Sequence, residues 1–272
     1  MSSMSDGGEA LWVAGCGLRY WNHGDGTTVV LTHGAGTDHT IFDAQVRFLT
    51  EAGHRVITWD LRGHGRSVPW DEPFDPAQAV EDLASLLERL SIVRTVLVGH
   101  GLGANISQVL ARRYPERVRA LVIIGSSSNA ARVTLRERLG DLVRTALLRR
   151  TPARALPGRL ADLSATTPGA RDFASRAFAR MSKERLLELW AAPRQLHHRR
   201  RWYRSRVPLC LVRGEHDRSG VASSMRRWAP RELIREVVIP GAGHLVTLDA
   251  PKAVNGVLGT FLQELQPAVR TL

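Results

Sequence analysis

The chain has 272 residues, of which 43% are hydrophobic, enough to build the core of one large α/β domain or of two small ones. It contains no run of 18 apolar residues, so we expect no membrane span, and the polar, acidic segment 1–9 does not resemble a secretory signal. The two cysteines, Cys16 and Cys210, lie in separate apolar runs, which predicts buried thiols of a cytoplasmic protein rather than a disulfide or a metal site.

The formal net charge of +12 is concentrated in one part of the chain. Residues 126–206 contain 19 Lys and Arg against 6 Asp and Glu, whereas the rest of the chain contains 19 basic and 20 acidic residues. All basic residues except Lys183 and Lys252 are arginine, a bias that a GC-rich coding sequence produces whatever the function. We therefore expect solvated arginines and no specific nucleic-acid partner, with an anionic ligand or surface as the alternative.

Short apolar strands alternate with amphipathic helices in the first 125 residues. The turn residues at 22–26 predict a hairpin between a strand within 11–21 and a strand over 27–32. The spacing of apolar residues then predicts, in order, a helix over 41–49, a strand over 55–59, a helix over 76–90, a strand over 95–98, a helix over 102–114 and a strand over 118–124. Nearly all-apolar strands that alternate with helices indicate a parallel sheet covered on both faces.

The alternation stops after Gly125. Residues 126–206 show helical patterns broken at prolines and no strand pattern. The strand pattern resumes at 207–212, and a helix near 221–228, a strand at 235–239 and a helix at 250–265 follow. We therefore predict a core formed by residues 1–125 and 207–272 and a helical cap formed by residues 126–206. Apolar cap residues at helical intervals are expected to pack the cap onto the core: Leu135, Leu139, Leu142, Val143, Leu147, Phe173, Phe178, Leu186, Leu187 and Trp190.

The segment Gly99-His100-Gly101-Leu102-Gly103 lies between a predicted strand and a predicted helix. A strand, a tight glycine turn and a helix form the context of a nucleophile elbow, whose pattern is G-x-S-x-G with the reactive serine at its centre. In this chain the central residue is Gly101, which has no side chain to act as a nucleophile.

Four further glycine-containing or charged motifs follow predicted strands. With the elbow they are, in chain order, HGAG at 33–36, DLRGHGRS at 60–67, GHGLG at 99–103, RGEHD at 213–217 and GAGH at 241–244. Together they resemble the cap-bearing branch of the α/β-hydrolase fold family, which includes esterases, lactonases, epoxide hydrolases and haloperoxidase-like enzymes. The resemblance covers about residues 11–266. It implies a mostly parallel, eight-stranded sheet with helices on both faces and an all-helical cap inserted after the sixth strand.

The resemblance also implies roles for individual residues. Asp217 matches the acid of the catalytic triad and His244 matches its histidine, in the chain order typical of the family. Asp217 would accept a hydrogen bond from His244 and stabilise its protonated form. The backbone N–H groups of Ala35 and Leu102 would form an oxyanion hole.

Other residues near the motifs are expected to line the pocket or to hold loops. Gly34 and His100 would lie at the substrate, whereas His33 and His64 would hold their loops. Trp190 and Trp202 of the cap would form substrate walls, and the basic cluster at 197–202 is either a contact for an acidic substrate group or a solvated hinge. The sequence contains no zinc pattern, P-loop or dinucleotide-binding unit, so we expect no cofactor or metal, a small-molecule substrate, and an oligomeric state that stays open.

Three interpretations of Gly101 remain open at this point. The protein is a serine hydrolase whose serine was replaced by glycine, a hydrolase or lyase in which His244 activates water or the substrate without a covalent intermediate, or a ligand-binding protein without catalysis. For an enzyme, the expected substrate is an ester, lactone or related carbonyl of a small, partly apolar molecule. Glycine suits the backbone of an elbow, because a strained conformation there costs other residues about 1–3 kcal/mol. The fold is therefore expected to be independent of the missing side chain.

Overall fold

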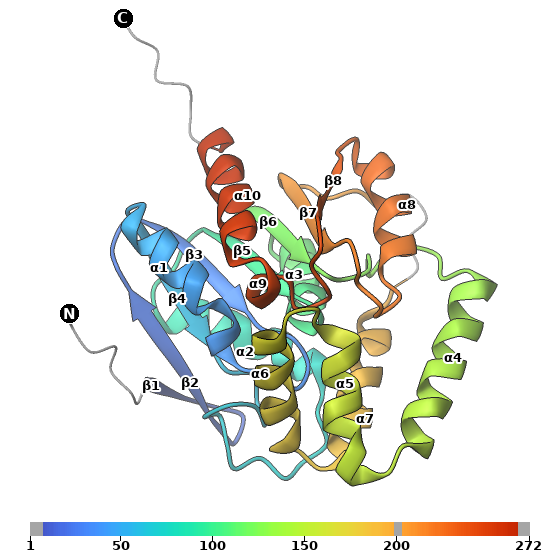
Figure 1. Cartoon of the computed structure of the whole chain (residues 1–272). Coiled ribbons are helices and arrows are strands. Elements are labelled where there is room, and N and C mark those ends of the chain that lie inside the picture. The colour runs from blue at the N-terminus through green and yellow to red at the C-terminus, as the bar shows by residue number, and fades with distance from the viewer. Residues whose placement is uncertain (1–7, 199–202, 266–272) are drawn as a thin grey trace, which may run out of the picture.

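A single eight-stranded sheet forms the centre of the molecule (Figure 1). The computed structural model describes residues 8–198 and 203–265. The strands lie in the order β1-β2-β4-β3-β5-β6-β7-β8. All neighbours from β4 to β8 are parallel, and β2 pairs antiparallel with both β1 and β4, which confirms the predicted mostly parallel sheet. The bounds are β1 Glu9–Val13, β2 Cys16–His23, β3 Thr27–Thr32, β4 His54–Trp59, β5 Thr95–His100, β6 Val118–Ile124, β7 Leu209–Gly214 and β8 Glu236–Ile239.

Helices cover both faces of this sheet (Figure 1). One hydrophobic cluster joins the strands to α2 (Pro76–Arg89), α3 (Leu102–Arg113) and α8 (Ala222–Glu232). A second cluster, on the opposite face, joins them to α1 (Asp43–Glu51), the short α9 (Val246–Asp249) and α10 (Pro251–Glu264). Apolar side chains on both faces explain why the central strands contain so few polar residues.

The predicted hairpin between segments 11–21 and 27–32 is wrong. The first segment divides into β1 and β2, which form a hairpin with each other, and β2 pairs with β4 instead of β3. β3 lies between β4 and β5 and runs parallel to both. Val29, Val30 and Leu31 are fully buried, and a strand that is apolar on both faces is more stable in the middle of a sheet than at its edge.

Four α-helices lie between β6 and β7, below the sheet in Figure 1. Leu156, Phe178 and Leu186 of this segment form a hydrophobic cluster together with Leu245 from the loop before α9. The main chain is also attached there, since the N–H of Leu245 donates to the carbonyl of Ser164 at 2.7 Å. The bounds of the four helices are α4 Leu135–Arg150, α5 Leu156–Ser164, α6 Pro168–Ala179 and α7 Lys183–Ala191.

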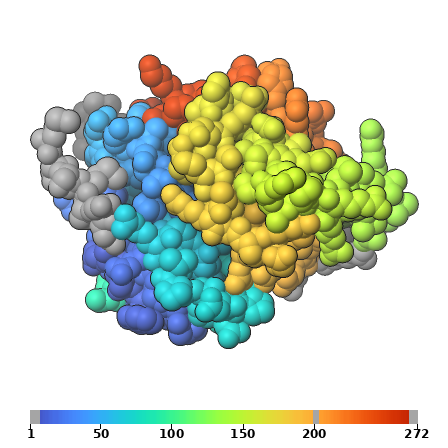
Figure 2. Space-filling view, turned by 60° about the horizontal axis from the view of Figure 1, so that its bottom comes forward, coloured from blue at the N-terminus to red at the C-terminus, as the bar shows by residue number. Residues whose placement is uncertain are grey.

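Helix α4 does not pack onto the core through the predicted residues, and the leucine that it buries is Leu148. Its apolar stripe faces solvent, with Leu135 83%, Leu139 64% and Leu142 67% exposed, and Val143 and Leu147 are exposed as well. The opposite side of the helix faces inward, where Glu137 pairs with Arg227 of α8 and Asp141 pairs with Arg194. In Figure 2, α4 (yellow-green) projects at the right edge of the molecule. Ion pairs therefore determine which face of α4 turns inward.

In the described part of the chain, no helix combines the length and the apolar composition that crossing a bilayer requires.

A buried ion pair connects the loop after β4 to helix α2. The guanidinium of Arg62 donates to both carboxylate oxygens of Asp82, with Nε 2.7 Å from Oδ2, and both side chains are buried. The same guanidinium lies 4.6 Å from the ring centre of Trp70. Because the carboxylate balances a charge that water cannot reach, its removal leaves a buried cation without a counterion.

We therefore predict that Asp82→Ala lowers the free energy of unfolding by about 3–5 kcal/mol, as measured by urea denaturation. Glu81→Ala on the same helix is the matched control, because the Glu81–Arg113 pair is partly exposed and such pairs contribute about 0–1 kcal/mol. Equal losses in the two variants would contradict this prediction.

Candidate active site

The elbow lies at the carboxyl end of β5 and packs directly against β3. Gly101 has φ +52° and ψ −117°, and its N–H donates to the carbonyl of Ile124 at 2.9 Å. A Cβ atom on Gly103 would lie 2.2 Å from the carbonyl oxygen of Thr32, so only glycine fits there. The close approach fixes the start of α3 relative to the neighbouring strand.

His244 and Asp217 come together from the loops that follow β8 and β7. The His244 Nδ1 atom lies 2.9 Å from Oδ2 of Asp217. The carboxylate can only accept, so Nδ1 carries the proton and Nε2 carries the free lone pair. The Asp217 side chain is fully buried, whereas that of His244 is 19% exposed. The carboxylate of Asp217, which is shielded from solvent, thus orients His244, and the Nε2 atom of His244 faces the cavity.

The free nitrogen of His244 faces the residue at the centre of the elbow. A Cβ atom on Gly101 would lie 3.5 Å from His244 Nε2 and 3.8 Å from the Cα atom of Gly34. Such a side chain would therefore meet no clash and would reach the imidazole directly. A hydroxyl oxygen on such a side chain would lie within hydrogen-bond distance of Nε2, as a nucleophile does with its base.

Electrostatic interactions in the pair stabilise its charged form. Burial alone raises the pKa of Asp217, but the charge of His244 and hydrogen bonds from His244 and Ser219 outweigh it and lower the pKa to about 2. Burial lowers the pKa of His244, and the charge and hydrogen bond of Asp217 more than offset this and raise it above 6.5. His244 is thus a stronger base than a free imidazole.

Two backbone N–H groups face the same cavity. Those of Ala35 and Leu102 donate to no acceptor among the residues that the structure describes, and both residues line the cavity. The peptide between Gly34 and Ala35 is held from its other side, because the carbonyl of Gly34 accepts from Thr37 Oγ1 at 3.0 Å and lies 2.8 Å from His33 Nδ1. Two donors are thus left without a protein acceptor beside one cavity.

His33 holds this peptide in a defined tautomer. The N–H of Leu61 donates to His33 Nε2 at 3.0 Å, so the ring proton is on Nδ1 and is donated to the carbonyl of Gly34. His33 is completely buried, and burial lowers its pKa even though Asp60 opposes the shift. His33 is therefore neutral and keeps this donor role at neutral pH.

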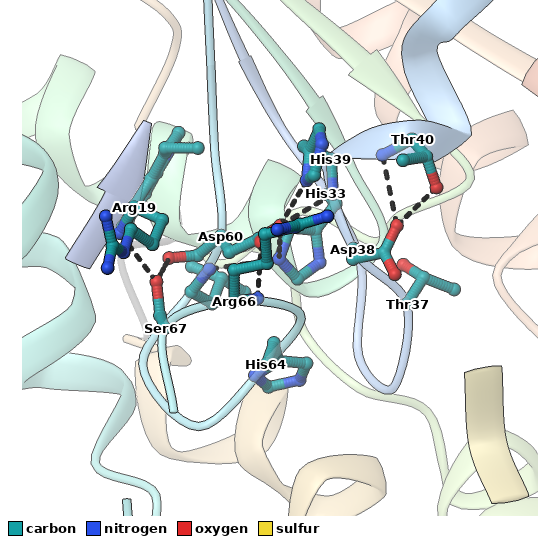
Figure 3. Close-up of polar contacts among 12 residues, drawn as sticks. Arg19, His33, Thr37, Asp38, His39, Thr40, Asp60, His64, Arg66 and Ser67 are labelled. Atoms are coloured by element: carbon teal, nitrogen blue, oxygen red, sulfur yellow. Dashed lines mark hydrogen bonds and ion pairs between the residues drawn. The ribbon is translucent and has the colours of Figure 1, made fainter. Parts of the chain in front are cut away.

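Asp60 anchors the loop from which Leu61 makes that contact (Figure 3). Its carboxylate accepts from the N–H and Nδ1 of His39, each at 2.8 Å, and from the N–H of Arg66 at 2.7 Å. Burial raises the pKa of Asp60, but the hydrogen bond from His39 and the neighbouring histidines outweigh it and lower the pKa. The sequence analysis assigned Asp60 no role, because its partners are distant along the chain.

His100 lies beside His244 and holds the histidine loop. Its Nε2 atom is 2.9 Å from the carbonyl of His244, and the two rings are 4.7 Å apart. Burial, together with the charge of His244, lowers the pKa of His100 to about 3. The residue is therefore an uncharged neighbour of His244, and it is among the residues that line the cavity.

The hydroxyl groups of Ser107 and Ser126 are engaged elsewhere. Ser107 donates to the carbonyl of Gly103 at 2.8 Å inside α3. Ser126 lines the cavity, but its hydroxyl donates to Asn105 Oδ1 at 2.9 Å. Neither is oriented as a nucleophile toward His244.

The site opens into a cavity of about 880 Å³ beneath the inserted helices. Trp190 lines it with Phe178 and Leu160 from the insertion. Gly34, which the sequence predicts at the substrate, is not part of the lining, although its Cα atom lies near the elbow. The loops Ser126–Asn129 and Ser219–Val221 also line it, although the sequence analysis did not select them. Their position directly after β6 and near the end of β7 is the signal that would have identified them. Trp202 lies outside the described residues.

Asp249 fastens the loop of His244 to the inserted helices. Its carboxylate accepts from the N–H of Gly243 at 2.8 Å and from the N–H groups of Thr166 and Thr167 at the start of α6. The backbone before His244 is thereby fixed to the segment that covers the cavity. Among the described residues, no group of three or more His, Cys, Asp or Glu side chains is arranged to hold a metal ion.

The chain is similar in sequence to known proteins. The putative carbamate hydrolase RutD of Variovorax paradoxus is 39% identical over 114 residues, which cover 41% of this chain and 43% of that protein. The dihydrolipoyllysine-residue acetyltransferase component of an acetoin cleaving system from Pseudomonas putida is 29% identical over 93% of this chain and 68% of that protein. The match with RutD thus spans less than half the length of that relative.

The fold is shared with solved structures. The enol-lactonase of Burkholderia xenovorans superposes with a TM-score of 0.80 at 22% identity, over 94% of this chain and all of that one. Residues 29–257 match the alpha/beta hydrolase family, as the five motifs predicted. Because this match spans most of the chain, the protein belongs to the alpha/beta hydrolase family.

Proposed function

We propose that the protein hydrolyses an ester, a lactone or a related carbonyl of a small, partly apolar molecule, without a covalent intermediate. The observation that carries this proposal is the position of His244 Nε2, which faces the empty centre of the elbow while Nδ1 is held by Asp217. The names of relatives, a putative carbamate hydrolase and an enol-lactonase, support attack on an activated carbonyl. The substrate itself is not specified by these names.

In the proposed mechanism a water molecule takes the place of a serine hydroxyl. A missing CH₂OH group leaves room for about one water. His244 Nε2 removes a proton from this water as its oxygen attacks the carbonyl carbon, and the N–H groups of Ala35 and Leu102 stabilise the oxyanion. When the tetrahedral intermediate collapses, the protonated His244 returns the proton to the leaving oxygen.

The inserted segment would control access to this site. We propose that residues 126–206 form a cap on a core of residues 1–125 and 207–272, since Leu160, Phe178 and Trp190 of that segment line the cavity. We also propose a cytoplasmic location, which the two free, buried cysteines support.

Substitution of the elbow residue tests the absence of a covalent route. We predict that a fluorophosphonate probe labels Gly101→Ser and leaves the unchanged protein unlabelled, because only serine supplies an oxygen next to His244 Nε2. The free energy of unfolding of Gly101→Ser should fall by about 1–3 kcal/mol, because φ at this position is positive.

Ester and lactone turnover in the same variants separates the alternatives. Under the proposal, the unchanged protein turns over such substrates and His244→Ala abolishes this activity. A rise in turnover by orders of magnitude in Gly101→Ser would instead identify an inactivated serine hydrolase. Absence of turnover in all three proteins would favour the ligand-binding alternative.

The pH dependence tests the Asp217–His244 pair. His244 acts as a base only when neutral, so kcat/KM should rise with pH through its raised pKa, above 6.5. Asp217→Asn removes the charge that raises this pKa, and the rise should move to lower pH by about 1–3 units. Turnover should also fall about 10²–10⁴-fold, since the ring loses its orientation. Asp162→Asn, at an exposed position of α5, is the matched control, and a similar shift in that variant would refute the assignment.

His33 tests the orientation of the oxyanion donors. We predict that His33→Ala lowers kcat about 10–100-fold with little change in KM, because the Gly34–Ala35 peptide loses the contact that aims its N–H. His64→Ala is the matched control: this ring is equally buried, but it contacts the carbonyl of Arg62 and not that of Gly34. Both variants should lose stability, so equal losses of kcat would argue against a role in positioning.

A further inference from the structure

The inward face of α4 presents an arginine to the cavity without an acceptor. The Arg144 side chain is 34% exposed and lines the cavity. Its guanidinium makes no hydrogen bond to any residue that the structure describes, and its Nε atom is buried. An arginine carries five N–H donors in a planar fork, so this group is available to an incoming anion.

The nearest carboxylate does not satisfy this arginine. Oδ1 of Asp141 lies 3.8 Å from Arg144 Nη2, beyond hydrogen-bond distance. Oδ2 of the same residue accepts from Arg194 Nε at 2.7 Å. Two guanidinium groups therefore share one carboxylate, and this part of the wall carries one excess positive charge.

Arg144 also contacts the loop that supplies the acid of the catalytic pair. A Cβ atom on Gly220 would lie 2.6 Å from Arg144 Nη2, so the absence of a side chain there lets the guanidinium rest on the backbone. Gly220 follows Asp217 by three residues. The cation and His244 therefore border one cavity, on two sides of the same loop.

The remaining lining reinforces the positive charge. Glu137 is occupied by Arg227 and Ser223 of α8, so it does not neutralise Arg144. Arg132 and Arg138 also line the cavity, and neither pairs with an acid among the described residues. Apolar side chains such as Leu160 and Phe178 also line the cavity.

We propose that Arg144 binds a carboxylate of the substrate, so that the molecule hydrolysed carries a carboxylate at one end, an apolar middle and the ester or lactone carbonyl at the other. This identification of the substrate class rests on the proposed hydrolytic function, whereas the binding site itself does not. We choose a carboxylate rather than a phosphate because a monoanion loses less hydration energy than a dianion when it enters a cavity with apolar lining near the elbow.

Binding of unreactive probes tests the site independently of catalysis. The probes are phenylalkanoates of increasing chain length and the corresponding neutral primary amides, titrated calorimetrically into the unchanged protein. The best carboxylate should bind at least about tenfold more tightly than its amide, the effect of one charge-assisted contact. This preference should fall to about unity in Arg144→Gln and should persist in part in Arg144→Lys, which keeps the charge but loses the fork.

Arg154→Gln is the matched control, since Arg154 is an exposed arginine of the same segment outside the cavity lining. It should keep the full preference for carboxylates. Equal affinity for acid and amide in the unchanged protein, or a preference that survives in Arg144→Gln, would overturn the proposal. Tighter binding of a phenylalkyl phosphate than of the carboxylate would overturn the choice of anion.

The same measurements separate the two proposals. If probe binding shows a carboxylate preference that depends on Arg144 but the protein hydrolyses no ester or lactone, the anion site is supported and the hydrolytic function is refuted. If neutral and carboxylate-bearing esters are hydrolysed with equal kcat/KM and probe binding shows no preference, the anion site is refuted and the hydrolytic function is supported.

Discussion

Close backbone contact between the elbow and β3 is the constraint on which the geometry of the site depends. The carbonyl of Thr32 occupies the space that a side chain at Gly103 would need, so α3 begins directly beside the end of β3. Ala35 and Leu102 consequently line one cavity, although they come from different strand ends. No part of this arrangement uses a side chain at position 101, so the proposed oxyanion donors do not depend on a nucleophile there.

The charges around His244 impose a second constraint on the site. His244 holds a proton more strongly than a free imidazole because Asp217 is buried next to it. The neighbouring His100 has a pKa of about 3 and stays neutral, so its ring fills the space beside the base without repelling the protonated form. The site therefore accommodates the one positive charge that forms when His244 accepts a proton.

Local sequence pattern predicted the elements and the positions of the site residues, because each follows a strand and parallel strands end at one edge of a sheet. It did not predict the partner of β3, since the turn residues at 22–26 are compatible with a hairpin and with a chain that crosses to another place in the sheet. It also placed the leucines of α4 on the wrong side. Helical spacing identifies an apolar stripe, whereas ion pairs of Glu137 and Asp141 with distant arginines decide which way it faces.

The absence of a nucleophile changes what the rest of the site must accomplish. A covalent intermediate holds its substrate by a bond, whereas attack by water requires that the carbonyl be held by non-covalent contacts throughout the reaction. The hydrogen bonds that link Asp60, Leu61 and His33 to the Gly34 carbonyl fix the peptide whose N–H we propose as one oxyanion donor. A carboxylate bound at Arg144 would fix the far end of the same substrate. A reaction that uses water instead of a serine oxygen requires the substrate to be held at both ends.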